Sequence, residues 1–146
     1  MKVLDEVKSI VEDELGLPFL YQSFYKLNDW VEVESLPCVC CQLITDMGTE
    51  NEGGQIKDDV PFLLMFVDKT EEGLTALENQ EIIDEQNTTA DSFLRELEDS
   101  TEIMKNSDAP RKLLYQEFDI ILTGISMKVN IKERSGSQPC TYKSWT

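Results

Sequence analysis

The first sixteen residues carry apolar positions in a helical period. Apolar side chains recur at steps of three and four residues, with acidic residues and lysines between them, at Val3, Leu4, Val7, Ile10, Val11 and Leu15. This spacing predicts an amphipathic helix. Gly16 and Pro18 end the helix, because glycine suits a helix C-terminus and proline cannot continue one.

Two short apolar runs predict buried strands. Residues 37–45 contain CVCCQLI, which is too short for a helix, and residues 60–68 read VPFLLMFVD, a pattern typical of a strand buried on both faces. The segment between them, 46–59, holds three glycines and five acids and predicts an exposed loop. Residues 19–30 are aromatic, and their pattern fits both a strand and a helix, so their conformation stays open.

The stretch from residue 68 to residue 102 is strongly acidic, with twelve acidic residues against Lys69 and Arg95. An apolar stripe at helical spacing runs through it, formed by Ile82, Ile83, Gln86, Ala90, Phe93, Leu94 and Leu97. We therefore predict a helix of about five to seven turns that lies on the sheet with its acidic side in water. Thr89 can also cap a second helix, so one continuous helix and two shorter ones both remain open.

After a polar connector at residues 105–110 the pattern returns to β-structure. Residues 113–117 and 118–132 predict two strands, and the apolar alternation of the second changes parity near Gly124. A glycine at that point predicts a bulge or kink that keeps both halves of the strand facing the same core.

The order of these elements predicts a single α+β domain over residues 1–134. In this fold one small mixed or antiparallel sheet packs against the N-terminal helix and the long central acidic helix. Residues 135–146 are polar, with only Tyr142 and Trp145 able to dock, and they predict a flexible C-terminal tail.

The charge of the chain excludes several classes of function. Twenty-nine acidic residues stand against thirteen basic ones, and the absence of histidine leaves a formal net charge of −16. Such a surface repels nucleic-acid phosphate and anionic lipid, so we expect no direct nucleic-acid or membrane binding. Without histidine, the usual base near neutral pH and the commonest zinc ligand are missing. We expect a non-enzymatic protein without a cofactor.

The location expected for the chain is the cytoplasm, or a particle assembled there. The N-terminal segment carries charge throughout and lacks the apolar region of a secretory signal. No run of about eighteen apolar residues follows.

Four cysteines are the most reactive side chains, and three of them are clustered at Cys38, Cys40 and Cys41, with Cys140 far along the chain. Four thiolates can hold zinc or an iron–sulfur cluster. Strand alternation, however, sends Cys38 and Cys40 to one face of the sheet and Cys41 to the other. This favours buried structural thiols, with a metal site and a disulfide as the alternatives.

The predicted elements follow one another in a definite order. The N-terminal helix comes first, then the two apolar strands, then the long helix ending in DSFLRELED, and last the segment beginning FDIILTGISMKVNIKE. In this order and over most of its length, the chain resembles the small α+β tail-completion, or tail-terminator, proteins of tailed bacteriophages and prophages. The resemblance implies a non-enzymatic ring subunit that caps the tail tube, a homo-oligomer with other tail components as partners. It transfers no catalytic residues.

The acidic helix supplies the candidate interaction surface. Its members are Glu78, Glu81, Asp84, Glu85, Asp91, Glu98 and Asp99, together with Trp145 in the tail. A tube that passes DNA needs a negative lumen, which suits a ring subunit with these acids facing the lumen or solvent. The alternative is an acidic inhibitor or regulator that mimics DNA and binds a basic cleft on another protein. The sequence leaves the oligomeric order and the partner open.

Overall fold

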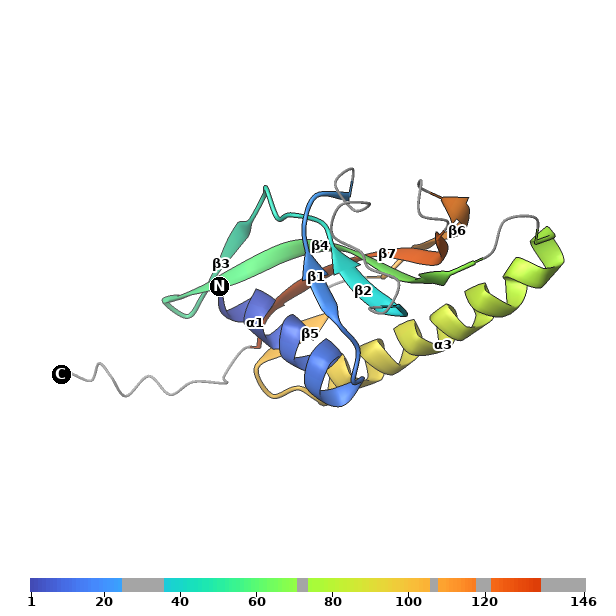
Figure 1. Ribbon diagram of the computed structural model, residues 1–146. Coiled ribbons are helices and arrows are strands. Elements are labelled where there is room, and N and C mark those ends of the chain that lie inside the picture. Colours follow the sequence, from blue (N-terminus) through green and yellow to red (C-terminus); the bar gives the residue numbers. More distant parts are fainter. Residues whose placement is uncertain (25–35, 71–73, 106–107, 118–121, 135–146) are drawn as a thin grey trace.

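The computed structural model describes residues 1–24, 36–70, 74–105, 108–117 and 122–134 (Figure 1). These residues form one seven-stranded sheet with two helices packed beneath it. The arrangement confirms the predicted α+β class. Neither helix in this part of the chain combines the length and the apolar composition that crossing a bilayer requires.

The N-terminal helix forms where the apolar spacing predicts it. Helix α1 spans Lys2–Ser9 and continues directly into the π-helical turn η1, Ile10–Glu14. Val3, Val7 and Val11 are completely buried, so the apolar stripe faces the sheet as expected.

The sheet is built around one long antiparallel pair. Its strands are β1 (Phe19–Tyr21), β2 (Cys38–Cys41), β3 (Gly48–Glu52), β4 (Gln55–Lys69), β5 (Ile103–Lys105), β6 (Arg111–Glu117) and β7 (Leu122–Glu133). Strands β4 and β7 pair from Asp59↔Lys132 to Lys69↔Leu122, and the main order is β1-β2-β4-β7-β5. Strand β3 also pairs with β4, and β6 also pairs with β7. Among the described strands only β1 and β2 pair in parallel.

The predicted strands are present, with different ends. The 37–45 prediction corresponds to β2, the 60–68 prediction lies within β4, and the 113–117 prediction lies within β6. The 118–132 prediction corresponds to β7 from residue 122 onwards, and residues 118–121 lie outside the described residues. Strand β5 was missed, and it contains the first residue of the predicted connector, because three residues are too few to show an alternating pattern.

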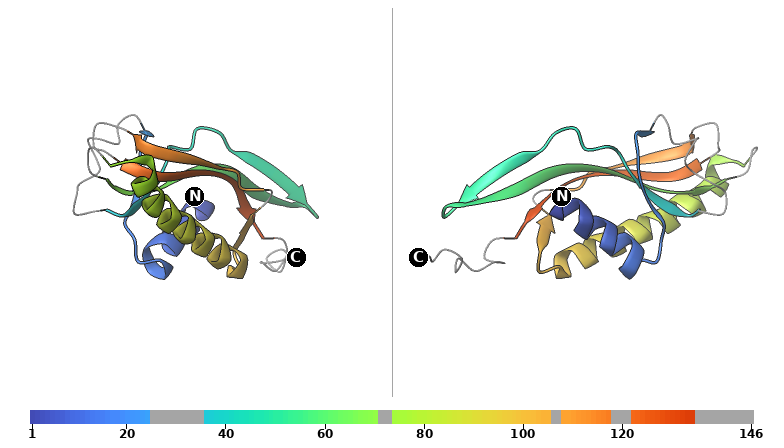
Figure 2. Two further views of the ribbon diagram at one scale, coloured as in Figure 1. Left: turned by 90° about the vertical axis from the view of Figure 1, so that its right-hand side faces the viewer. Right: turned by 60° about the vertical axis from the view of Figure 1, so that its left-hand side comes forward.

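The prediction of a loop at residues 46–59 is wrong, although most of the described residues of this segment are exposed as expected. This segment forms a hairpin in which β3 pairs with the first part of β4, from Gly48↔Asp59 to Glu52↔Gln55. Gly53 and Gly54 make the turn with positive φ angles of 58° and 87°, which glycine adopts without strain. The hairpin extends beyond the helices (Figure 2). Since this ribbon is largely polar, it lacked the apolar alternation by which a strand is recognised.

The long acidic segment forms a single helix. Helix α3 spans Ala76–Asp99 without a break, which settles the choice between one helix and two. The hydroxyls of Thr88 and Thr89 donate to the backbone carbonyls of Asp84 and Glu85, four residues earlier, at 3.0 and 3.1 Å. The threonines are therefore accommodated within the helix. The predicted stripe faces the sheet, with Ile83, Gln86, Ala90, Phe93 and Leu97 buried and Ile82 and Leu94 half-buried.

Both ends of α3 are held to the sheet by polar contacts. Near the start, the buried Thr70 hydroxyl donates to Asn79 Oδ1 at 2.5 Å. At the other end, the Arg134 guanidinium donates from Nη2 to the Glu98 carbonyl at 2.9 Å and from Nε to the Ser100 carbonyl at 2.5 Å. Arg134 thus satisfies carbonyls that the helix leaves without partners.

Gly124 does not mark a bulge in its own strand. Strand β7 pairs with β4 in unbroken register through Gly124↔Val67, and the register shift lies on the neighbouring β6, between Leu114 and Glu117. The glycine is needed for close backbone approach, because a Cβ there would overlap the Phe66 carbonyl oxygen. The change of parity has another meaning: the two ends of β7 contribute to cores on opposite faces of the sheet.

The two faces of the sheet differ in what covers them. The face that α1 and α3 cover, termed the helix face, carries the main core. In this core the rings of Phe66 and Phe93 meet edge to face with centroids 6.0 Å apart. The opposite face, termed the open face, carries no helix in the described part of the chain. It holds a smaller buried cluster of Cys38, Cys40, Met65, Val67 and Leu122.

Candidate interaction surfaces

The acids predicted to form an interaction surface point into solvent. All seven on α3 are exposed: Glu78, Glu81, Asp84, Glu85, Asp91, Glu98 and Asp99. The expected water-facing acidic side of the helix is therefore confirmed, and its role in binding stays a prediction. Trp145, the eighth predicted residue, lies outside the described residues.

Three of the seven acids have partners within the chain. Glu78 forms a capping box with Thr75: its carboxylate accepts from the Thr75 N–H at 3.0 Å, and these hydrogen bonds hold the pKa of Glu78 below its usual value. Asp91 accepts from Arg111 at 2.6 Å, and Asp84 accepts from Gln80 at 3.0 Å.

The other four acids are left to solvent. In the described part of the chain, no hydrogen bond or ion pair involves the carboxylates of Glu81, Glu85, Glu98 and Asp99. They are available to counter-ions or to a basic partner.

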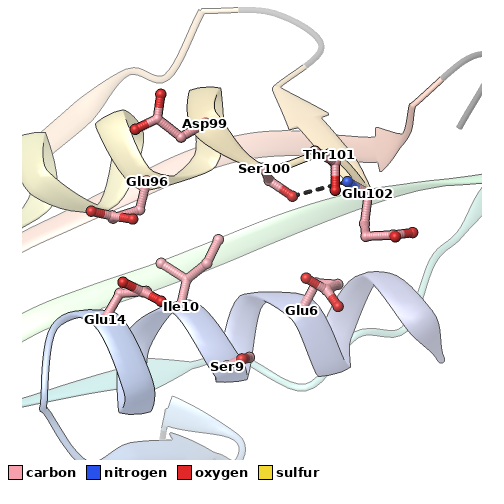
Figure 3. Close-up of a pocket in the computed structure, with 9 residues that line it drawn as sticks. All are labelled: Glu6, Ser9, Ile10, Glu14, Glu96, Asp99, Ser100, Thr101 and Glu102. Carbon is pink, nitrogen blue, oxygen red and sulfur yellow. Dashed lines mark hydrogen bonds between the residues drawn. The ribbon is translucent and has the colours of Figure 1, made fainter.

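A cleft between the N-terminal helix and the end of α3 concentrates further acids (Figure 3). Its volume is about 270 Å³, and five carboxylates line it, those of Glu6, Glu14, Glu96, Asp99 and Glu102. Lys2 forms an ion pair with Glu102 at 2.7 Å, and this hydrogen bond raises the pKa of Lys2. The cleft attracts cations. The sequence shows the acids but not that two distant helices bring them together.

The cysteines of β2 lie as strand alternation predicts. Cys41 packs in the main core, whereas Cys38 and Cys40 belong to the open-face cluster, with their sulfurs 3.7 Å apart. Hydrogen bonding to Cys38 and burial raise the pKa of Cys40, and burial raises that of Cys41 to about 12. At neutral pH these two thiols stay protonated, which makes them poor nucleophiles and poor metal ligands. Cys140 lies outside the described residues.

The open face carries a second surface of different chemistry. Two adjoining cavities of about 400 and 330 Å³ share Leu63, Lys112 and Ser126. The first is also lined by Phe24, Met65, Leu113 and Leu114, and the second by Pro110, Arg111 and Lys128. We term this the open-face groove. Its walls are mainly apolar and cationic, and none of the described residues that line the two cavities carries a carboxylate.

The lysines of the groove are exposed in a protein that has an excess of acids. In the described part of the chain, neither the Lys112 nor the Lys128 ammonium group forms an ion pair. Arg111 differs, because its guanidinium reaches α3 and binds Asp91 and Asn87. The two lysines are therefore available to negative groups from outside.

Sequence reasoning missed this groove, although part of its signal is visible. In β7, Lys128, Asn130 and Lys132 alternate with the buried Val129 and Ile131, which indicates that one face of the strand is uncovered. The contribution of Lys112 cannot be read locally, because it depends on the pairing Lys112↔Ser126 between β6 and β7.

Comparison of the chain with models of protein families and with curated proteins finds no match.

Proposed function

We propose that the protein is a non-enzymatic assembly protein, a ring subunit of the tail-completion or tail-terminator class. One observation carries the proposal: a single subunit presents two complementary surfaces on opposite sides of its sheet. The helices offer carboxylates, and the open-face groove offers apolar side chains with two lysines that form no ion pair among the residues the structure describes. Complementary surfaces on opposite sides of a subunit support head-to-tail contacts, which close into rings when the rotation between subunits permits.

The segregation of charge is strong. Helix α1 and turn η1 carry five acids and two lysines, and α3 carries eight acids and one arginine. Among the described residues that line the groove, by contrast, none is acidic, and Lys112 and Lys128 form no ion pair there, whereas Arg111 is paired with Asp91 of α3. Attraction between unlike surfaces on neighbouring subunits offsets part of the repulsion that a net charge of −16 imposes on any self-association.

The acidic surface also suits the channel of such a ring. Helix α3 has 24 residues and is therefore about 36 Å long, with exposed acids along its whole length. A lumen lined in this way repels phosphate and lets DNA pass without binding. The compartment proposed is the cytoplasm, or a particle assembled there.

Size-exclusion chromatography with light scattering tests the proposal. Moderate salt, about 0.15 M, is required, because it shortens the range of repulsion between subunits to about 8 Å. We expect one discrete oligomer whose fraction rises with protein concentration, and ring-shaped particles in negative-stain electron microscopy. A strict monomer at high concentration that also fails to assemble on a tail tube would overturn the proposal.

A second candidate function is an acidic inhibitor or regulator that mimics DNA. The observation that favours it is the set of unpaired carboxylates on one continuous helix, including Glu81, Glu85 and Glu98. Such a protein binds a DNA-binding protein in a salt-dependent way and is displaced by duplex DNA. Ring assembly predicts no displacement by DNA, so a competition experiment separates the two functions.

A further inference from the structure

We infer that the open-face groove of one subunit receives Leu77 of a second copy, with Glu81 and Asp84 of the same helix placed against Lys112 and Lys128. This inference rests on the proposed function, because it names the contact by which subunits join. It also assigns a role to Leu77 and Lys112, which neither the charge of the chain nor its periodicity singles out.

Leu77 is the apolar side chain that enters the groove in this contact. It is 81 % exposed, more than any other large apolar side chain among the described residues. At 100° per residue it lies on the side of α3 opposite the buried stripe of Ile83, Gln86 and Ala90. Glu81 and Asp84 follow on the same side, one and two turns later. The helix thus presents one apolar knob followed by carboxylates.

The groove matches this pattern in reverse. Its larger cavity, of about 400 Å³, is lined by Phe24, Leu63, Met65 and Leu114, which offer apolar contact to a leucine. Lys112 borders both cavities and Lys128 borders the second. A leucine in the first cavity therefore brings carboxylates on the following turns towards free ammonium groups, and the pairing sets the direction of the incoming helix.

The contact must join different subunits. Helix α3 lies beneath the sheet (Figures 1 and 2), whereas Met65 and Leu114, which line the groove, belong to the cluster on the opposite face. A chain therefore cannot insert its own Leu77 into its own groove. Because knob and groove occupy opposite sides, the contact is heterologous: each subunit uses its groove towards one neighbour and its Leu77 towards the other. An open chain of subunits leaves one groove and one Leu77 without a partner subunit, whereas a closed ring leaves none.

A set of charge exchanges tests the contact in the full-length protein by sedimentation equilibrium at about 0.15 M salt. Leu77→Ser and Lys112→Glu are each expected to weaken self-association at least about tenfold. Glu81→Lys is expected to do the same, since it places a lysine against Lys112. All three positions are exposed, so circular dichroism should show a native fold.

Mixing supplies the decisive measurement. Neither the Lys112→Glu protein nor the Glu81→Lys protein should associate well alone, but an equimolar mixture should restore assembly. In the mixture, the groove of the Lys112→Glu protein receives the helix of the Glu81→Lys protein, and the unchanged groove receives the unchanged helix. Glu12→Lys and Lys8→Glu are matched controls: both are exposed, lie on the N-terminal helix and turn, and change the net charge by the same amount. Both controls should assemble like the wild type.

The outcomes separate this inference from the proposed function. Wild-type protein that stays monomeric overturns the contact, and if it also fails to assemble on a tail tube it overturns the ring subunit as well. Wild-type assembly that survives both Leu77→Ser and Lys112→Glu leaves the ring subunit standing and overturns the contact. Loss of assembly in Lys112→Glu but not in Leu77→Ser shows that the groove holds some other acidic segment, and also overturns the inference.

Discussion

The same strands contribute side chains of different character to the two faces of the sheet. In β4, Phe62, Leu64 and Phe66 point to the helix face and are buried, whereas Leu63 between them points to the open face and is half-buried. In β7 the contrast is sharper, since Val129 is buried beneath the sheet and Lys128 is exposed above it. In the described part of the chain the helix face therefore holds the larger buried core, and the open face is the one to which we assign recognition in our proposal. Substitutions that act on one face and spare the other test this division.

The largest expected effect lies in the helix-face core. Phe93→Ala removes a fully buried ring that packs against Phe66, so the free energy of unfolding should fall by about 3–5 kcal/mol. Urea unfolding followed by circular dichroism measures the loss. Leu63→Ala is the control on the open face and should cost less than about 2 kcal/mol, because that side chain is only half-buried. Equal losses would contradict the division between the faces.

The next effect concerns the strand pair that both faces share. In Gly124→Ala the new methyl group would overlap the Phe66 carbonyl oxygen, so β4 and β7 must separate locally. We expect a loss of about 1–3 kcal/mol in thermal or urea unfolding. Gly48→Ala is the matched control, because the nearest atom to its Cβ is the Asp59 carbonyl oxygen at 3.4 Å, and it should change stability by less than about 0.5 kcal/mol. Similar losses for the two variants would argue against close approach at Gly124.

A smaller effect is expected at the start of α3. Thr75→Ala removes the hydroxyl that accepts from the Glu78 N–H at 3.1 Å, which should lower the free energy of unfolding by about 0.5–2 kcal/mol. Thr101→Ala, at an exposed threonine outside the helix, should leave it within about 0.5 kcal/mol of wild type.

The capping box also predicts a dependence on pH. The pKa of Glu78 is lower in the folded than in the unfolded chain, so its stabilising contribution is present above the unfolded pKa and is lost as the pH falls through the folded value. Glu78→Gln should therefore be less stable than wild type near neutral pH, and the difference should shrink on acidification. A difference that stays constant down to strongly acidic pH would contradict this origin.

The smallest effect concerns the reactivity of the cysteine thiols on the two faces, which is compared without a change in stability. In a Cys140→Ser background, Cys38 and Cys40 report on the open face and Cys41 on the helix face. All three are buried, so their thiols in native protein at pH 8 should not react with a thiol-specific disulfide reagent within minutes. In protein unfolded in urea, all three thiols should react. Rapid reaction of two thiols in the native state would mean that the open-face cluster is less closed than the helix-face core.

Periodic elements were predictable because their signal is local. The apolar stripe of Ile83, Gln86 and Phe93 identifies α3 from its own residues, and alternation places Cys41 on the face opposite Cys40. Elements without a buried stripe were missed or misread. The β3–β4 hairpin is largely polar, so the sequence read as a loop, and only the pairing of the two strands with each other reveals it.

The acidic segment already required from its own residues that the charged side of α3 face water, because burying so many carboxylates without partners costs far more than solvating them. Strand alternation likewise placed Cys41 on the face opposite Cys38 and Cys40. That Leu63, Lys112 and Lys128 meet on one surface follows only from strand pairing, because they come from β4, β6 and β7 and are joined by the pairings Leu63↔Lys128 and Lys112↔Ser126. A groove of this kind is a property of strand register, and register depends on contacts between residues that are distant in the chain.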